Sequence, residues 1–523
     1  MKPLISLWHG HDATIVIYDY DTNEFHNIGI ERVVKKKHYF VQNDFGLQET
    51  LNVIEHQLGY KNDFSTLLLS KNLFDVAFGR ISNGITSKIV HVLDTIRAEQ
   101  IIIGNHNILH HDAHAWSTYA QSPFDRAFAM TYDGGGDGTH HQIFKFEGIK
   151  CTYRKSMPYR MASAYDTLGN VFPTIAETRK EDRAGKLMAL TCYSDKINQD
   201  VWNFADYANH IKPEDTMFPD KKWSEKFFEK DGPGHADNDW FMLDEDNNFT
   251  HPRNAPHKMI AAYKEVYNKW LPPLDISDEE KYSYAYTIQQ HLEDMVVNII
   301  RNEYWDHIVD CDYNVIVSGG VALNILLNQR IREEFPEINL YVAPNPGDDG
   351  LAFGMIYYYL CQTYFNQKTQ IDLRYKDLPL LDEYRYKPGK ESSIAEVSQL
   401  LKDGNIIGLV QGRLEVGPRA LGNRSILCDP RDPAMKDKIN QTVKFREDYR
   451  PFAPVCRLED APKWFEGPYE NLETMSYALK VKENANIPAV THADGTARLQ
   501  TVTKDDNTLL YDLLTEFNGV LLN

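Results

Sequence analysis

The sequence predicts a fold of the α/β class with two domains, and three observations support this prediction. Apolar strands run into glycine turns at residues 3–8, at 127–132 and before the Ser-Gly-Gly triplet at 318–320. Residues 281–301 carry apolar side chains at steps of three and four, which predicts an amphipathic helix. A chain of 523 residues with 42% hydrophobic content is also long enough for more than one core.

Two strand–turn–strand units indicate a duplicated architecture. Residues 3–8 continue into "GHDATIVIYDYDTNEFHNIGIER", which predicts a glycine turn and a hairpin, and residues 127–132 continue into "DGGGDGTHHQIFKF" in the same order. Such turns favour nucleotide binding, because phosphates lie across them. Further along, "YNVIVSGGVALNILLNQRI" and "INLYVAPNPGDDG" each predict a strand that opens into a helix, as in α/β proteins.

The predicted domain boundary falls in residues 362–392, where short polar runs surround "DLPLLDEYRYKPGK". We therefore expect a first domain at 1–370 and a second at 385–523. Residues 201–275 have no regular period and many aromatic side chains. This indicates an insertion that either covers a site or has no role in it. Four of its aromatic residues have two possible roles: they stack on a sugar or base, or they pack on their own domain. These residues are Trp202, Trp223, Phe227 and Trp240.

Composition limits the classes of partner. The chain has 75 acidic and 56 basic residues, a net charge of -19, which disfavours nucleic acid and anionic membranes. The six cysteines form no CxxC pair, which argues against a disulfide framework. No segment approaches the roughly 18 apolar residues of a membrane span, and no signal-peptide core follows the N-terminus. We expect a cytoplasmic protein without membrane association, and a homodimer is the default oligomer.

The stretch "LHHDAHAWSTYA" suggests half of a metal site. On a helix, His110 and His114 share one face, as two imidazoles must to reach one ion. Asp133 and Asp348 each follow a predicted strand, and the carboxyl ends of parallel strands meet at one edge of a sheet. Two imidazoles and two carboxylates suit Fe(II), Mn(II) or Zn(II). Alternatively, the histidines are a polar patch and the aspartates only cap their glycine turns.

Basic residues accumulate in the C-terminal third, within "GRLEVGPRALGNRSILCDPRDP" and "INQTVKFREDYRPFAP". Arginine presents a fixed fork of donors for phosphate and carboxylate oxygens, and the turns at Gly417, Pro418 and Gly422 can add backbone N–H groups. The alternative is a solvated face balanced by Glu415, Glu447 and Asp448. The basic residues are Arg413, Arg419, Arg424, Arg431, Lys444, Arg446 and Arg450.

At these segments the chain resembles the carbamoyltransferase family that includes nodulation protein U and tobramycin carbamoyltransferase. The similar stretches are "EVGPRALGNRSILCDPR", "INQTVKFREDYRPFAP" and "HADGTARLQTV". N-terminal motifs of the family are present in order: "GHDATIVIYD", "IERVVKKKH", "HHDAH", "DGGGDG", "AGKLMAL", "SGGVALN" and "PNPGDDG". The resemblance spans nearly the whole chain, and the match at "GPRALGNRSI" is highly specific.

The resemblance implies an N-terminal domain of the ASKHA type (actin, sugar kinase, Hsp70) and a C-terminal domain like threonylcarbamoyl-AMP synthase (YrdC-like). It further implies an ATP-dependent O-carbamoyltransferase, in which carbamoyl phosphate and ATP give carbamoyl adenylate and the carbamoyl group then passes to a sugar-like, nucleoside or natural-product hydroxyl. The implied cofactors are Fe(II) or another divalent metal, ATP and Mg. A family motif "NTSFN" follows the equivalent of "GVLLN", whereas this sequence ends at Asn523, so we expect a shortened C-terminal domain.

The resemblance also assigns roles residue by residue. The implied metal ligands are His110, His114, Asp133 and Asp348. The implied nucleotide-binding residues are Gly135, Gly136, Lys186, Ser318, Gly319, Gly320 and Asn324. The residues expected to bind carbamoyl phosphate or the adenylate are Arg419, Asn423, Arg424, Ser425, Lys444, Arg446, Arg450 and Arg498.

An acceptor hydroxyl needs a base, and His11 or Asp12 of "GHDAT" is our candidate, because that loop is expected to face the same cleft. Alternatively, this loop only hydrogen-bonds its own turn. Two other functions stay open for the whole chain. One is a catalytically silent nucleotide- and metal-binding regulator, and the other is a sugar kinase, which would release ADP and leave the basic segment unexplained.

Overall fold

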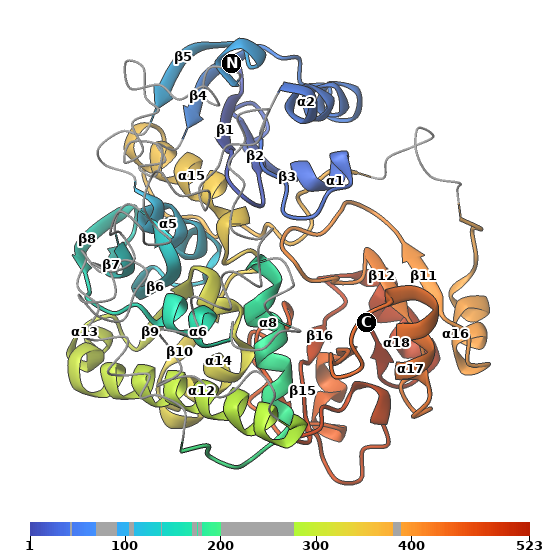
Figure 1. The fold of residues 1–523 in the computed structure, drawn as a ribbon. Coiled ribbons are helices and arrows are strands. Elements are labelled where there is room, and N and C mark those ends of the chain that lie inside the picture. The colour runs from blue at the N-terminus through green and yellow to red at the C-terminus, as the bar shows by residue number, and fades with distance from the viewer. Residues whose placement is uncertain are drawn as a thin grey trace, which may run out of the picture. The chain divides into compact units, whose positions relative to one another are not determined.

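The computed structural model describes residues 1–41, 44–69, 92–103, 109–136, 139–169, 175, 180–199, 277–379 and 389–523. The chain divides into two compact units. Figure 1 labels the helices and strands of the chain. The first comprises Met1–Met157 and Asn302–Asn523, and the second comprises Pro158–Arg301. The insertion expected at 201–275, with its four aromatic residues, lies outside the described residues. The mixed α/β class predicted from the sequence is confirmed.

The first unit contains two five-stranded sheets with the same topology. In each sheet, the first three strands form an antiparallel meander. The first of these strands also pairs in parallel with a fourth strand, and the fourth pairs in parallel with a fifth. The first sheet has the order β3-β2-β1-β4-β5, with β1 (Leu4–Trp8), β2 (Thr14–Asp19), β3 (Glu24–Gly29), β4 (Phe64–Leu69) and β5 (Ala98–Ile103). The second has the order β10-β9-β6-β7-β8, with β6 (Arg126–Gly136), β7 (Thr139–Glu147), β8 (Lys150–Ser156), β9 (Asn314–Ser318) and β10 (Asn339–Val342). The duplication predicted from the two strand–turn–strand units is therefore present in the strands.

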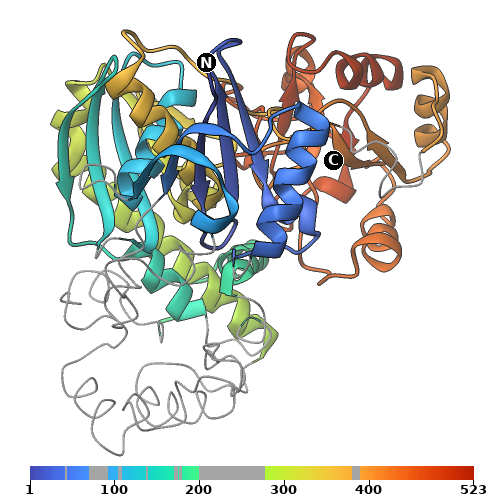
Figure 2. The same ribbon diagram turned by 90° about the horizontal axis from the view of Figure 1, so that it is seen from above.

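Two helices fill the space between the sheets: α5 (His110–Gln121) packs on the second sheet and α15 (Leu351–Thr363) on the first (Figure 2). Strand β1 is buried on both faces, because Leu4 and Trp8 join the core around these helices while Ile5 and Leu7 join another core. That second core contains residues of α2 (Asp44–Leu58) and α1 (Ile30–Val34). This double burial explains the nearly continuous apolar run at the start of the chain.

The loops after the parallel strands of the second sheet lead directly into short helices. After β9, the 3₁₀ turn Gly320–Leu323 continues into α14 (Ile325–Glu334). After β10, the 3₁₀ turn Asp348–Gly350 continues into α15. These are the strand-to-helix connections predicted from "VSGGVALN" and "PNPGDDG", and they lie at the carboxyl ends of their strands.

The C-terminal part of the first unit has an apolar core of its own, made by residues such as Leu427, Val455, Leu510 and Leu521. Its strands are short and form three small sheets. The helices and strands of this part are α16 (Ile394–Lys402), β11 (Ile407–Val410), β12 (Arg424–Leu427), α17 (Met435–Ile439), β13 (Pro454–Arg457), β14 (Leu479–Lys480), β15 (Thr496–Ala497), β16 (Gln500–Val502), α18 (Thr508–Phe517) and β17 (Leu521–Leu522). The short helix α13 (Trp305–Val309) comes earlier in the chain, before β9, and contacts β6. The threonylcarbamoyl-AMP synthase-like fold and the boundary near 370–385 stay predictions.

The second unit contains the helix predicted over 281–301, which is observed as α12 (Asp278–Ile299). It begins with a capping box, in which Ser277 Oγ accepts the backbone N–H of Glu280 and the Glu280 carboxylate accepts the backbone N–H of Ser277. Helices α6 (Met161–Gly169) and α8 (Lys180–Leu190) pack on it. Among the described helices, none is long and apolar enough to cross a lipid bilayer.

Candidate metal centre and cationic site

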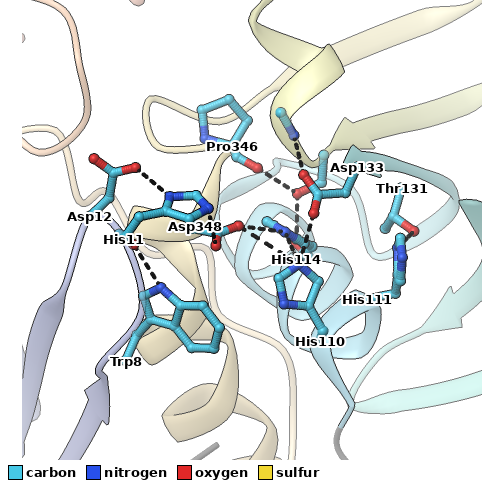
Figure 3. Close-up of polar contacts among 12 residues, drawn as sticks. Trp8, His11, Asp12, His110, His111, His114, Thr131, Asp133, Pro346 and Asp348 are labelled. Carbon is cyan, nitrogen blue, oxygen red and sulfur yellow. Dashed lines mark hydrogen bonds and ion pairs between the residues drawn. The ribbon is translucent and has the colours of Figure 1, made fainter. Parts of the chain in front are cut away.

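The four residues expected to bind a metal come together at the carboxyl-end edge of the second sheet (Figure 3). His110 and His114 lie one turn apart on α5, Asp133 lies near the end of β6, and Asp348 begins the turn after β10. One side-chain donor atom of each lies within 4.8 Å of the donor atoms of the other three. The spacing predicted from the sequence is thus realised in one small cluster.

The distances within this cluster fit a cation better than they fit hydrogen bonds. His110 Nε2 lies 3.0 Å from Asp133 Oδ2, 3.1 Å from His114 Nε2 and 3.7 Å from Asp348 Oδ1. His114 Nε2 lies 3.4 Å from the same Asp348 oxygen. One imidazole nitrogen carries at most one proton, so it cannot donate to all three neighbours. Ligands bound at ~2.1 Å would be separated by roughly 3.0–3.4 Å, so these donors suit a divalent transition metal.

The electrostatics of Asp133 agree with a role as an anionic ligand. Burial alone would raise its pKa, but the hydrogen bond from His110 and the positive potential of His110 and His114 hold the pKa well below its usual range. Its second oxygen, Oδ1, accepts the backbone N–H of Gly320 at 3.0 Å. Asp133 therefore connects the histidine helix to the glycine loop after β9.

His111, between the two candidate ligands, points the other way. Its Nδ1 lies 2.8 Å from Thr131 Oγ1 and its Nε2 lies 3.2 Å from the backbone oxygen of Thr139 (Figure 3). Burial, followed by the charge of His110, lowers the pKa of His111 to about 3. His111 is thus a neutral residue that ties α5 to the second sheet.

The candidate bases His11 and Asp12 border the cluster from the turn between β1 and β2. His11 Nε2 lies 3.1 Å from Asp348 Oδ2, and His11 Nδ1 lies 2.8 Å from Asp12 Oδ2 (Figure 3). The charge of Asp348 is the main cause that raises the pKa of His11 to about 10, against the opposing effect of burial. Hydrogen bonds from His11 and His38 lower the pKa of Asp12 despite its burial. His11 therefore connects the first sheet to the cluster on the second.

His38 is a neighbour of this site that the sequence reasoning missed. Its Nδ1 lies 2.6 Å from Asp12 Oδ1, so that one carboxylate lies between two imidazoles. Its backbone N–H donates to Glu31 Oε2 at 2.9 Å. The only signal in the sequence was the motif "IERVVKKKH", which contains both residues. No local spacing links this motif to Asp12, because the contact forms through the tertiary fold.

The glycine loop after β9 has little room for any side chain. Gly319 has a φ of +87°, and a Cβ at this position would lie 2.1 Å from the backbone oxygen of Tyr132. Its N–H donates to the backbone oxygen of Pro346 at 2.7 Å. The Ser318 hydroxyl donates to the backbone oxygen of His114 at 2.9 Å and accepts from Thr118. The Ser318 hydroxyl is thus hydrogen-bonded within the fold, and its contact with a nucleotide stays a prediction.

The remaining residues expected to bind a nucleotide lie in three places. Asn324 caps α14, where its Oδ1 accepts the backbone N–H of Leu327 at 3.0 Å. Gly135 and Gly136 form the end of β6, close to Asp133 in sequence. Lys186 lies on α8 in the second unit, where it is buried. Nucleotide binding by these residues stays a prediction.

The C-terminal part of the first unit contains a cluster of cations that repel one another. Burial, and then the charge of Arg450, lower the pKa of Arg419 and of Arg446 to about 10. Burial also lowers the pKa of Arg498 far below its usual range, and Arg419, Arg446 and Arg450 add to this effect. The pKa of Lys444 is lowered by burial and by the two neighbouring arginines. We call these residues the cationic cluster: Arg419, Lys444, Arg446, Arg450 and Arg498.

Counter-charges are scarce around this cluster. Within the described part of the chain, one member of the cluster has an ion pair: Arg450 lies 3.8 Å from Glu447, and both side chains are partly exposed. Arg498 Nε is buried and has no hydrogen-bond partner. A cluster with four partly buried arginines and a single ion-paired carboxylate among the described residues favours an anionic ligand, because an unpaired buried charge is otherwise costly. Of the carboxylates in the alternative interpretation, Glu447 pairs with Arg450, whereas Glu415 is buried.

Three of the residues expected to bind the anion have hydrogen bonds within their own loop region. The Arg424 guanidinium donates to the backbone oxygens of Gln411, Asn423 and Gly412. Asn423 Nδ2 donates to the backbone oxygen of Arg413 at 2.7 Å. Ser425 Oγ accepts the backbone N–H of Gly422 at 3.0 Å. These residues stabilise the loop that carries Arg419, and their role as direct ligands stays a prediction.

Arg419 also reaches the loops of the second sheet. It lines a small recess together with the segments that follow β9 and β10, the same connections that carry Gly320 and Asp348. The residues lining the recess are Ala322, Leu323, Ile325, Val342, Ala343, Pro344, Pro346, Arg419, Thr474, Met475 and Ser476. Arg419 therefore lies beside the residues that follow the glycine loop.

Comparisons with known proteins agree with the motifs. The family model described as "Carbamoyltransferase N-terminus" matches residues 60–356, and "Carbamoyltransferase C-terminus" matches residues 398–521. The 3'-hydroxymethylcephem-O-carbamoyltransferase of Streptomyces clavuligerus is 41% identical over 364 residues, covering 67% of this chain and 60% of that protein. Nodulation protein NolNO of Sinorhizobium fredii is 30% identical over 432 residues, covering 78% of this chain and 56% of that protein. The alignments thus span less than two thirds of either relative.

Among solved structures, full-length HypF in its phosphate- and nucleotide-bound form is similar with a TM-score of 0.39 and 12% sequence identity. The match covers 70% of this chain and 47% of that one.

Proposed function

Because the chain belongs to the carbamoyltransferase family, we propose that it is an ATP-dependent O-carbamoyltransferase with two sites of different chemistry. In one half-reaction, water splits carbamoyl phosphate into carbamate and phosphate, and a carbamate oxygen then attacks the α-phosphorus of ATP, which forms carbamoyl adenylate and releases pyrophosphate. The other transfers the carbamoyl group to an acceptor hydroxyl and releases AMP. The observation that supports this proposal most strongly is that one compact unit contains both a cluster of metal-type donors and a cluster of cations that repel one another.

The cationic cluster is the proposed site for the phosphate-bearing substrates. Carbamoyl phosphate and ATP are multiply charged anions, and guanidinium groups bind phosphate oxygens with paired hydrogen bonds. Partly buried cations act more strongly than exposed ones, because little water screens them. Arg419 also lines the recess beside the glycine loop, so it can contact a nucleotide that reaches both.

The four-residue cluster is the proposed site for carbamoyl transfer. A divalent cation held by His110, His114, Asp133 and Asp348 would supply Lewis-acid chemistry and charge compensation for the departing AMP. The backbone of Gly320 holds Asp133 in place and brings the helix N-terminus after β9 to the same edge. Anions bind such glycine turns through backbone N–H groups.

His11 or Asp12 is the proposed proton acceptor for the attacking hydroxyl. With a pKa of about 10, His11 holds its proton at neutral pH as long as the charge of Asp348 faces it uncompensated. Because Asp348 is the main cause of this shift, His11 becomes a base only where that charge is offset. Asp12 orients the imidazole through Nδ1 in either case.

The test is a product assay with matched variants. The chain is incubated with ATP, Mg²⁺, Fe(II), carbamoyl phosphate and a panel of hydroxylated acceptors, and pyrophosphate, AMP, ADP and carbamoylated product are measured. We expect carbamoyl-phosphate-dependent pyrophosphate and AMP. Arg419→Ala should lose pyrophosphate release, whereas His114→Ala should keep it and lose the transfer. ADP as the product would indicate a kinase, and nucleotide binding without turnover would indicate a regulator; either result contradicts the proposal.

A further inference from the structure

Glu415 is a buried carboxylate at the start of the loop that carries Arg419. The residue is 2% exposed, and its Oε1 accepts three backbone N–H groups, from Leu421 at 3.1 Å and from Asn423 and Arg424 at 2.8 Å. Among the described residues, no basic side chain pairs with it within ion-pair distance. The carboxylate therefore takes the place inside the loop that an anion takes in a backbone nest. It is not a counter-charge on a solvated face, which was one interpretation of the sequence.

The same loop is fixed where it begins. Gly417 has a φ of +93°, and a Cβ there would lie 2.1 Å from the backbone oxygen of Pro344. Arg32 donates through Nη2 to the backbone oxygen of Gly417 at 3.0 Å. The first residues of the loop are thus held against the connection after β10 and against α1.

Its later carbonyl groups are also occupied. The backbone oxygen of Leu421 accepts from the hydroxyl of Tyr375 at 2.9 Å and from Gln500 Nε2 at 3.0 Å. The backbone oxygen of Ala420 accepts from Asn523 Nδ2 at 3.1 Å. The residues on both sides of Arg419 therefore have little freedom to move, while the Arg419 guanidinium has no carboxylate partner within ion-pair distance in the described residues.

The rigidity of this loop opposes the electrostatic repulsion between Arg419 and its neighbouring arginines. Arg419 faces the charges of Arg450 and Arg498, which repel it and favour a loop that swings away. A preorganised site must hold its charges in place before the ligand arrives, which needs a second layer of fixed hydrogen bonds. Glu415 makes three of these hydrogen bonds from one oxygen, more than any other side chain makes with this loop's N–H groups in the described structure.

We propose that Glu415 is a positioning residue that holds Arg419 in the cationic cluster, ready for a phosphate group. The inference rests on the proposed function, because the anion is the phosphate of its substrates. Glu415 itself does not touch the ligand. Its removal should weaken phosphate binding without abolishing the other members of the cluster.

The test compares four chains by calorimetric titration with inorganic phosphate: the natural chain, Glu415→Ala, Glu415→Gln and Arg419→Ala. Gln keeps an acceptor oxygen at the same reach, so we expect its affinity to stay within about threefold of the natural chain. We expect Glu415→Ala to lose about tenfold or more, similar to Arg419→Ala. Where turnover is measurable, KM for carbamoyl phosphate should rise more than kcat falls. Near-UV circular dichroism checks that each variant is folded.

Glu415→Asp is the second variant if Glu415→Ala does not fold. Its carboxylate is set back by one methylene, so we expect a folded chain with weaker phosphate binding. Unchanged phosphate affinity in folded Glu415→Ala, or in Glu415→Asp, would overturn the positioning role. The natural chain could bind phosphate more tightly than these variants and yet form no carbamoyl-phosphate-dependent AMP. That result would refute the proposed function and leave the role of Glu415 standing. No phosphate binding by the natural chain would overturn both.

Discussion

The backbone N–H of Gly320 donates to Oδ1 of Asp133 at 3.0 Å, so the glycine loop after β9 and a candidate metal ligand share one carboxylate. The other oxygen of that carboxylate faces His110. The conformation of the loop and the position of the ligand therefore depend on each other.

A methyl group at Gly319 should disturb both features. The φ of +87° is unfavourable for alanine, and the new Cβ would clash with the backbone oxygen of Tyr132. We expect Gly319→Ala to lower the free energy of unfolding by about 1–3 kcal/mol and to weaken divalent-metal binding. Gly408→Ala on β11 is the control, because its Cβ has open space and should change neither quantity. Urea unfolding and equilibrium dialysis measure the two effects; equal behaviour of both variants would contradict this account.

Removing one imidazole from the four-residue cluster should abolish tight metal binding. His114 is completely buried with its Nε2 directed at Asp348, so His114→Ala removes a donor that water replaces poorly. We expect metal affinity to fall by about 100-fold or more, judged against the ~10–100-fold losses seen for residues that only support a ligand. His111→Gln is the matched control from the same helix turn and should keep its metal content in elemental analysis. Equal metal content in the two variants would argue against the site.

Arg419 and Arg424 should respond in opposite ways to truncation. Arg424 donates to three backbone oxygens of its own loop region, so we expect Arg424→Ala to lose about 1–3 kcal/mol of unfolding free energy. Arg419 is repelled by its neighbours, so Arg419→Ala should keep or raise the Tm while it loses phosphate binding. Calorimetry of both variants separates the roles. A lower Tm for Arg419→Ala together with intact phosphate affinity would reverse the assignment.

Stability should fall in mildly acidic solution because of His26. Its Nδ1 accepts from Arg413 at 2.9 Å, its Nε2 lies 3.0 Å from the Tyr60 hydroxyl, and that hydroxyl donates to Asp19. Burial and then the charge of Arg413 lower the pKa of His26 to about 4; Lys376 acts in the same direction, against Glu24 and Asp19. Between pH 6.5 and 4 the unfolded chain binds a proton that the folded chain refuses, so the free energy of unfolding decreases as the pH falls.

The full contribution of His26 over this window is about 3 kcal/mol. His26→Asn keeps an acceptor for Arg413 and cannot titrate, so its stability should depend less steeply on pH. Urea unfolding of both chains at pH 7.5, 6.5, 5.5 and 4.5 makes the comparison. Parallel curves would show that His26 stays uncharged in both states or charged in both.

The sequence predicted the elements whose patterns are local. The helix α12 followed from its apolar period, and the convergence of His110, His114, Asp133 and Asp348 followed from helix spacing and from the shared edge of parallel strands. The contact of His38 with Asp12 was not predictable, because it depends on how the segment after β3 folds over the first turn. Distance along the chain gives no indication of such contacts.

The sequence also did not predict the hydrogen-bond partners of polar residues in turns. Ser318, Asn423 and Ser425 were assigned to ligands from the family resemblance. In the structure, Asn423 and Ser425 hydrogen-bond within their own loop region, and Ser318 hydrogen-bonds to α5. Glu415 was considered only as a counter-charge, because composition cannot show that a carboxylate is buried. Burial and partner choice are set by tertiary packing, which single-sequence patterns do not encode.

The candidate metal site also affects the stability of the fold, because its ligands lie far apart in the sequence. The four donor atoms come from a helix packed between the sheets, from a strand and from a connection more than 200 residues downstream, so an unfolded chain offers no equivalent set. An ion bound there acts as a crosslink between distant segments, and free metal at 100 times its Kd adds about 2.7 kcal/mol to the unfolding free energy. Material prepared in a strong chelator should therefore melt at a lower temperature and yield faster to proteases than the same material after metal is restored.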